Sequence, residues 1–286
     1  IGNGDRPSQA LRRGTRSSMR LAIDAVQTGE AAGVVSAGNT GALMAMSKVV
    51  LKTQPGIDRP AMISYFPTVR GESAMVDLGA SLKCDARNLV EFAIMGAGFA
   101  RSVLGLERPT VGLLNVGIEE AKGNETVRAA GQTLRESEFG FEFHGFVEGN
   151  DVGAGTVDVF VTDGFTGNAV IKTTEGTALL ISTYLTAAFR RSWVSRLGYL
   201  LAKPALDALR DKLDARQYNG ALFLGLNGVV VKSHGGTDDE GFASAISVAA
   251  DMVRGDFNER IHADLEHVHP PAAAEAENGR KAAAVS

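Results

Sequence analysis

Residues 157–174, VDVFVTDGFTGNAVIKTT, constrain the fold most, because they read as a buried strand, a sharp turn and a helix in immediate succession. β-Branched residues occupy every second position of the first part, as in a strand. Asp163 and Gly164 end this run, and an apolar pattern with helical spacing opens at Ala169. Such a unit is typical of folds in which strands alternate with helices.

The same order of strand, Gly-rich turn and helix recurs along the chain. Residues 33–41 and residues 110–125 both pass from a short apolar strand through a turn rich in Gly and Asn into a helix. The other expected strands are Ala61–Pro67, Glu72–Leu78, Glu142–Phe146 and a pair within Gly220–Gly236, and the other expected helices are Ser8–Gln27, Asn88–Leu104 and Gly241–Met252. This pattern predicts an α/β fold with a mostly parallel sheet flanked by helices, and ligands bind such sheets beyond the carboxyl ends of the strands.

The turn at residues 163–168 has the composition of an anion site. Gly164 and Gly167 allow backbone angles that other residues resist, so the chain can pass close to a ligand. Free N–H groups at the start of the following helix, together with the helix dipole, favour a negative group. Asp163, Asn168 and Lys172 lie around the same point. We therefore expect this turn and the related ones to converge on one pocket of the size of a phosphate group.

Composition and missing motifs exclude several kinds of protein. A formal net charge of −4 over 286 residues argues against wholesale nucleic-acid binding. The single cysteine, Cys84, excludes an internal disulfide, fits a reducing cytosol, and is interpreted as a small buried hydrophobe. The sequence has no G-x-G-x-x-G, no Gly-Lys dipeptide, no G-x-S-x-G and no H-E-x-x-H. We expect no cofactor and no metal.

The domain organisation is expected to be simple. Residues 1–269 form one catalytic α/β domain, and residues 270–286, which lack apolar periodicity, form a disordered tail. His262, His267 and His269 adjoin this tail and are interpreted as incidental. The longest uncharged apolar stretch, Gly176–Phe189, is too short to span a bilayer.

Two segments are strongly basic. An N-terminal run carries Arg12, Arg13 and Arg16, which form either a solvated helix face or a dock for an acidic partner. Leu185–Leu206 lies in an expected helical hairpin over about residues 185–217 and combines basic side chains with Trp and Leu. Two interpretations of the hairpin remain open: it packs on a partner subunit, or it contacts an anionic membrane transiently.

Several motifs occur in an order that resembles one known family. They are Ser36–Gly41 (SAGNTG), Asp77–Ala80 (DLGA), Lys122–Glu125 (KGNE), Val147–Gly149 (VEG), Asp163–Asn168 (DGFTGN) and Leu224–His234. From about Asp5 to about Val253 the chain is similar to the bacterial phosphate acyltransferases of phospholipid synthesis, the acyl-ACP:phosphate transacylases of the PlsX family. The family begins with further elements, including a strand with Asp-Ala-Met-Gly-Gly-Asp, that precede the segment matching Ile1 and are not in this sequence.

The resemblance implies a fold similar to isocitrate and isopropylmalate dehydrogenases, and a homodimer that works in the cytoplasm or loosely at the membrane. It also implies transfer of a fatty acyl group from acyl carrier protein to inorganic phosphate, with the product passed to a downstream glycerol-phosphate acyltransferase. We expect the turns Gly38–Gly41 and Gly164–Asn168 to hold phosphate, and Lys122 or His234 to polarise the thioester or protonate the thiolate.

The candidate residues fall into four groups. Catalytic candidates are Lys122, Asn168, Lys172 and His234; phosphate- or substrate-binding candidates are Ser36, Gly38, Asn39, Thr40, Gly41, Asn115, Gly123, Asn124, Asp163, Gly164 and Gly167. Candidates for membrane or acyl-chain contact are Trp193, Leu197, Tyr199 and Leu200, and for carrier docking Arg12, Arg13, Arg16, Arg190 and Arg191.

Each role has a plainer alternative. Asn39 or Thr40 can serve as a helix cap only, Lys172 as a surface lysine, and His234 as a turn histidine. For the whole chain, two other functions fit the same residues. One is a phosphotransacetylase-like enzyme that uses acyl-CoA. The other is a non-catalytic, membrane-associated scaffold for lipid-synthesis partners.

Overall fold

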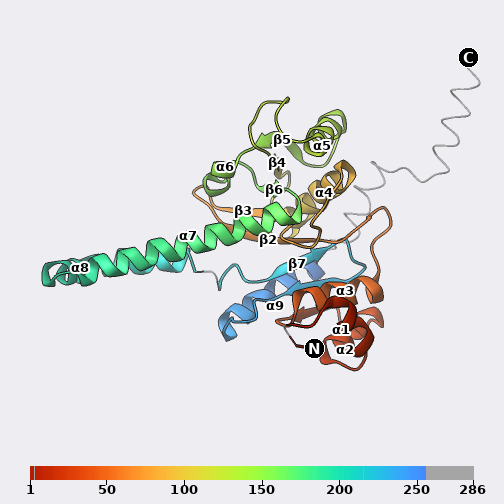
Figure 1. The fold of residues 1–286 in the computed structure, drawn as a ribbon, viewed down its shortest axis with the longest axis horizontal. Helices are drawn as coiled ribbons and strands as arrows, with labels where there is room; N and C mark the ends of the chain where they lie inside the picture. The colour runs from red at the N-terminus through yellow and green to blue at the C-terminus, as the bar shows by residue number, and fades with distance from the viewer. Residues whose placement is uncertain (3, 215, 256–286) are drawn as a thin grey trace, which may run out of the picture.

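The computed structural model describes residues 1–2, 4–214 and 216–255, and in this part of the chain the strands form one mixed sheet with helices on both faces (Figure 1). The histidines at 262, 267 and 269 and the tail 270–286 lie outside the described residues. The strands are β1 Gly33–Ser36, β2 Ala61–Pro67, β3 Glu72–Val76, β4 Thr110–Leu114, β5 Glu142–Val147, β6 Val159–Val161, β7 Ala221–Leu224 and β8 Val229–Lys232.

The strand order is β1-β8-β7-β2-β3-β6-β4-β5. The pairs β1–β8, β3–β6, β6–β4 and β4–β5 are parallel, as expected, whereas β8–β7, β7–β2 and β2–β3 are antiparallel. The antiparallel centre has a consequence for the turns. Because the direction reverses between β8 and β3, the carboxyl ends of β1 and β8 lie at one edge of the sheet and those of β3, β6, β4 and β5 at the opposite edge.

The helices are α1 Pro7–Arg13, α2 Ser18–Gln27, α3 Thr40–Leu51, α4 Ala86–Val103, α5 Glu125–Glu136, α6 Gly149–Ala154, α7 Gly164–Arg190, α8 Trp193–Lys212 and α9 Asp239–Arg254. The first three cover one face of the sheet around Leu43 and Val230, and α4 and α9 cover the other face around Val231. A third apolar cluster, which includes Met75 and Phe160, lies beside α6 and the start of α7. The core therefore occupies both sides of the sheet.

Two expected helices differ from the structure. The helix expected over Ser8–Gln27 is divided in two, because Gly14 packs so closely on α3 that a Cβ there would lie 2.6 Å from Met46 Cε. Ser17 then caps α2 by accepting a hydrogen bond from Arg20 N. The helix expected to be amphipathic over Asn88–Leu104 is instead buried on every side from Asn88 to Ala100, because it is enclosed by the sheet, α5 and α9.

The helical hairpin is longer than expected. Helix α7 runs without interruption from Gly164, at the edge of the sheet, to Arg190, and α8 returns along it as far as Lys212. Figure 1 shows this pair projecting from the sheet as an arm. Every residue of α7 from 172 to 188 is exposed, and α8 has no buried residue. Among the described residues, no helix combines the length and apolar character needed to cross a membrane.

Candidate functional site

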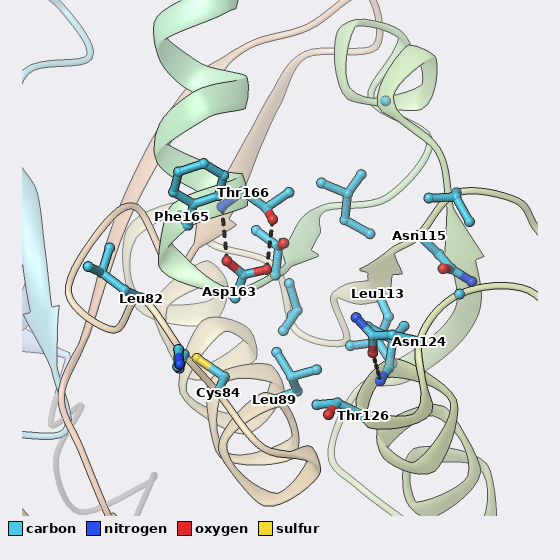
Figure 2. A pocket seen from close by; sticks show the side chains of 18 residues that line it. Leu82, Cys84, Leu89, Leu113, Asn115, Asn124, Thr126, Asp163, Phe165 and Thr166 are labelled. Carbon is cyan, nitrogen blue, oxygen red and sulfur yellow. Dashed lines mark hydrogen bonds between the residues drawn. The ribbon is translucent and has the colours of Figure 1, made fainter.

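A cavity of about 690 Å³ opens at the edge of the sheet where β4 and β6 end (Figure 2). It is enclosed by the loop before α4, the end of β4, the start of α5, and the turn from β6 into α7. Its lining residues are Leu82, Lys83, Cys84, Leu89, Leu113, Leu114, Asn115, Val116, Gly123, Asn124, Thr126, Val127, Gly149, Val161, Thr162, Asp163, Phe165 and Thr166. The volume lies in the range of small-molecule sites in proteins.

The start of α7 is closed by the protein's own groups. Asp163 is the N-cap, and its carboxylate accepts hydrogen bonds from Thr166 N at 3.0 Å and Thr166 Oγ1 at 2.7 Å. Gly164 N donates to Ser81 O at 2.9 Å, and Gly167 N donates to Asp163 O. Only Phe165, among the first four residues of α7, has an N–H without an acceptor in the described chain. The expectation of bare amides at this helix start is therefore wrong.

Gly164 and Gly167 allow the first turn of α7 to pack closely on the loop that follows β3. A Cβ at Gly164 would lie 2.7 Å from Asp77 Oδ2, and one at Gly167 would lie 2.0 Å from Asp77 O. Both glycines have ordinary helical angles, so lack of a side chain, rather than unusual backbone angles, is what the fold requires. The first turn of α7 thus packs on the loop that follows β3, where the sequence analysis expected a ligand.

Asp77 organises this loop and was absent from the candidate residues. Its fully buried carboxylate accepts hydrogen bonds from the backbone N–H groups of Met62, Gly79, Ala80 and Ser81, at 2.6–3.2 Å. Burial raises the pKa of Asp77 above its ordinary value, and the four donors oppose that rise. The sequence signal for such a loop is an acid directly after a buried strand, followed by Leu-Gly-Ala at residues 78–80.

The second polar wall of the cavity is held by Asn115. Its amide Nδ2 donates to Lys122 O at 3.1 Å, which closes the turn after β4. Gly123 has a φ of +85° and lies against the Asn115 side chain, so a residue with a Cβ would be both strained and blocked. Asn124 then caps α5 by accepting a hydrogen bond from Val127 N at 2.9 Å. The N–H groups of Glu125 and Thr126 have no acceptor among the described residues.

The structure brings part of the expected set together. Asn115, Gly123, Asn124 and Asp163 line the cavity, and the backbone of Lys122 adjoins it. Gly164 and Gly167 lie behind its wall, on the Asp77 loop. Asn168 also faces that loop, since a Cβ at Gly79 would lie 3.7 Å from Asn168 Cβ. Lys172 is exposed two turns further along α7, outside the cavity lining.

A second polar group forms at the opposite edge of the sheet, after β1 and β8. It contains Ser36, Gly38, Asn39, Thr40, Gly41 and His234. Ser233 N donates to Ser36 O at 3.0 Å, which joins the two turns. Asn39, rather than Thr40, caps α3 by accepting from Ala42 N, and His234 Nδ1 accepts from Gly236 N.

The expectation that all these turns share one pocket is therefore wrong for the described chain. None of the second group lines the cavity, because β1 and β8 run opposite to β4 and β6. The sequence pattern predicted a mostly parallel sheet and did not predict the antiparallel pairs at its centre. Lys232, which was not a candidate residue, lies beside Ser36 across the β1–β8 pair, and its ammonium donates to Ser233 O. Burial lowers the pKa of Lys232.

Five polar lining residues of the main cavity were not candidates: Lys83, Cys84, Thr126, Thr162 and Thr166. Burial, together with the nearby Asp77 carboxylate, raises the pKa of the Cys84 thiol to about 11. A thiol of that pKa is almost wholly protonated at neutral pH, which makes it a poor nucleophile. The interpretation of Cys84 as a small, largely apolar side chain therefore fits its half-buried position.

A separate groove of about 810 Å³ runs between α7 and α8. Tyr199 lies in it and makes an edge-to-face contact with Phe189 at 5.4 Å, while Trp193, Leu197 and Leu200 are exposed on α8. Of the expected docking residues, Arg190 and Arg191 lie at the turn of the hairpin, whereas Arg12, Arg13 and Arg16 lie in and after α1. None of these arginines lines the main cavity.

The sequence as a whole matches known proteins over most of its length. Residues 1–260 match the family model described as fatty acid synthesis protein. The phosphate acyltransferase of Rhodospirillum centenum is 61% identical over 282 residues, which cover 98% of this chain and 79% of that protein. The phosphate acyltransferase of Acidiphilium cryptum is 60% identical over 265 residues, which cover 93% of this chain and 70% of that protein.

Solved structures share the fold at low sequence identity. A phosphotransacetylase from Streptococcus pyogenes has a TM-score of 0.58 and 18% identity, covering 86% of this chain and 70% of that one. A 4-hydroxythreonine-4-phosphate dehydrogenase from Klebsiella pneumoniae has a TM-score of 0.50 and 15% identity, covering 86% and 71%. These matches confirm the α/β class and the expected relation to dehydrogenase-like folds, and they show the fold alone.

Proposed function

We propose, from the premise that this chain belongs to the fatty acid synthesis protein family, that the cavity between β4, β6, α5 and α7 is where a fatty acyl thioester meets inorganic phosphate. The chain is an acyltransferase of fatty acid and phospholipid synthesis, with phosphate as the acceptor. One observation carries the choice of site: this cavity joins a polar rim, with Asn115, Asn124 and Asp163, to an apolar floor.

The reaction needs two groups held in contact. A phosphate oxygen attacks the thioester carbonyl carbon, the new C–O bond forms, and the C–S bond breaks to release a thiolate that takes up a proton. Phosphate is already a nucleophile at neutral pH, so the protein's task is to hold a dianion beside the carbonyl and to stabilise the oxyanion that develops. Holding the two reactants in position, together with fixed hydrogen-bond donors and charges, can accelerate this reaction without a covalent intermediate.

We place phosphate at the rim formed by the start of α5. The N–H groups of Glu125 and Thr126 are without acceptors in the described chain, and the helix dipole adds positive potential there. Lys83 contributes a cation from the facing wall. Lys122, whose backbone is fixed by Asn115, is the proposed donor of a proton to the departing thiolate. Asp163 keeps the wall in place as the cap of α7.

We propose acyl carrier protein as the donor of the acyl group. This carrier is acidic, so an arginine cluster is a suitable dock. The two expected clusters can be separated by charge reversal: Arg12→Glu with Arg13→Glu changes one, and Arg190→Glu with Arg191→Glu changes the other. The pair that raises KM for the carrier-bound donor, and spares a small acyl thioester, identifies the dock. No change in either pair would place the dock elsewhere.

We also propose that the α7–α8 hairpin packs on a second copy of the chain. Two helices whose side chains are almost all exposed gain little from packing within one chain, and isolated helices are marginal in water. The residues around Trp193 and Leu197, next to Arg190 and Arg191, are suited to brief contact with an anionic membrane. Such contact would bring the acyl phosphate to a downstream glycerol-phosphate acyltransferase.

The test is phosphate-dependent loss of acyl carrier protein thioester in a sample of the purified chain, with acyl-CoA as a competing donor. We expect loss that requires phosphate and prefers the carrier-bound donor. Preference for acyl-CoA would favour a phosphotransacetylase-like activity. Absence of phosphate-dependent loss with either donor would favour the scaffold interpretation and contradict the proposal.

A further inference from the structure

The floor of the main cavity has a different character from its rim. Leu89, Leu113 and Val161 form the floor and are almost completely buried, at 2%, 1% and 0% exposure. They belong to the main hydrophobic core, so the floor is the upper surface of that core. Val127 and Cys84, which are half-buried, complete the floor. A ligand that reaches this floor must be apolar, because it would meet few polar groups there.

The mouth of the cavity carries large apolar side chains in the open. Leu82, Val116 and Phe165 line it and are 69%, 78% and 68% exposed. They come from three segments that are distant in sequence, namely the loops before α4 and after β4 and the first turn of α7. Figure 2 shows Leu82 and Phe165 on one side of the cavity, apart from the buried Leu89 and Leu113. Exposed apolar residues gathered at an opening indicate a binding surface.

The groove between α7 and α8 is the alternative binding site for an alkyl chain, and it is less suitable than the main cavity. Six charged side chains line that groove: Arg190, Arg196, Asp207, Arg210, Asp214 and Arg216. Among the described residues, the charged ones that line the main cavity are Lys83 and Asp163. The groove also begins at Ala178, 14 residues after Gly164, which corresponds to about 21 Å along α7 at 1.5 Å per residue.

We infer that the floor formed by Leu89, Leu113, Val127 and Val161 receives the alkyl chain of the acyl donor, starting at the methylene groups next to the thioester, and thereby sets chain-length preference. This inference rests on the proposed function, since it places the reacting carbonyl at the polar rim. The alkyl chain enters past Leu82, Val116 and Phe165 and replaces water over the buried leucines. The alkyl chain therefore lies in the main cavity and not along the hairpin residues that the sequence suggested for it.

The first experiment uses the substitution Val127→Phe, whose larger side chain reduces the space available above the floor of the cavity. The control is Val103→Phe, because Val103 is also half-buried against the same core but does not line the cavity. The measured quantity is the ratio of kcat/KM for hexadecanoyl and octanoyl carrier protein. We expect Val127→Phe to lower this ratio at least about tenfold, since a pocket discriminates strongly against methylene groups that no longer fit. Val103→Phe should leave the ratio at the wild-type value.

The second measurement uses the unchanged protein, so it does not depend on the folding of a variant. Cys84 is the single cysteine of the chain and lines the floor, so its alkylation by N-ethylmaleimide at alkaline pH reports on occupancy. We expect hexadecanoyl phosphate to slow the labelling several-fold, and acetyl phosphate to leave the rate unchanged.

The outcomes separate this inference from the proposed function. An active Val127→Phe variant with the wild-type ratio, or a Cys84 labelling rate indifferent to hexadecanoyl phosphate, would overturn the inference and leave the acyl transfer intact. Equal protection by the carrier with its bare pantetheine arm would assign the floor to that arm instead. No phosphate-dependent turnover of any donor by the wild type would refute the proposed function itself.

Discussion

The two edges of this sheet share one sequence pattern and differ in what their turns become. At both edges a strand leads through Gly and polar residues into a helix capped by Asn or Asp. At the edge where β4 and β6 end, the turns enclose a cavity with an apolar floor. At the edge where β1 and β8 end, Ser36, Thr40 and His234 line no part of that cavity, although Lys232 and the start of α3 lie close by.

The difference teaches that a Gly-rich turn does not by itself make a binding site. At the start of α7 the glycines admit the Asp77 loop, and Ser81 and Asp163 accept from every N–H group of the first four residues except that of Phe165. At the start of α5 the N–H groups of Glu125 and Thr126 have no acceptor in the described chain, and Thr126 lines the cavity. Strand direction decides which turns meet, and the sheet reverses direction between β8 and β3.

The largest expected effect concerns the two lysines near α7. Lys83 lines the cavity, whereas Lys172 is exposed outside it. Lys83→Ala should lower kcat/KM for phosphate by about 10²-fold, because it removes a cation that faces the attacking dianion. Lys172→Ala is the matched control and should stay within a few-fold of wild type. Steady-state kinetics at varied phosphate concentration measure both, and the reverse order of effects would place the dianion outside the cavity.

The next effect concerns the stability of the cavity wall. Gly167→Ala should destabilise the protein by about 1–3 kcal/mol, because its Cβ would lie 2.0 Å from Asp77 O. Gly176→Ala on the same helix has no atom within 4 Å of the new Cβ and should stabilise it by about 0.5–1 kcal/mol. Urea unfolding compares the two variants. A similar result for both would mean that α7 does not pack on the Asp77 loop.

A smaller effect concerns pH. Burial raises the pKa of Asp77 above 3.8, so between 3.8 and the raised value the folded state binds more protons than the unfolded state. The contribution of Asp77 to the free energy of unfolding therefore falls as pH rises through this window. Asp77→Asn should lower the free energy of unfolding at every pH, because it disrupts the four hydrogen bonds. It should also remove the decrease in this free energy with rising pH that Asp77 causes. The measurement is urea unfolding of the wild type and the variant across the acidic pH range. An equal pH dependence of the free energy of unfolding in both proteins would contradict this prediction.

The smallest effect is expected at the opposite edge. Thr40→Ala and His234→Ala should each leave kcat/KM for phosphate within a few-fold of wild type, because neither residue lines the cavity. Asn39 remains the cap of α3 in both variants, so the fold is preserved. The same kinetic assay applies. A loss comparable to that of Lys83→Ala would show that the β1–β8 edge takes part in binding the acceptor.

Much of the fold could be predicted from the sequence, because alternating strands and Gly-rich turns are local patterns. The residues of β2 and the turn from β6 into α7 follow directly from them. The reversal of direction at β7 could not, because strand pairing depends on contacts distant in sequence. Asp77 was missed because one of its four donors, Met62 N, comes from the neighbouring strand β2, 15 residues earlier in the chain. Lys83 has no local signal that distinguishes it from a surface lysine.

The most direct test of the central claim is a titration of the wild-type protein with inorganic phosphate, followed through the backbone amide chemical shifts. The account predicts the largest shifts at Glu125 and Thr126, at the start of α5, and little change at Thr40 and Gly41. Shifts concentrated at Thr40 and Gly41, with Glu125 and Thr126 unmoved, would contradict it.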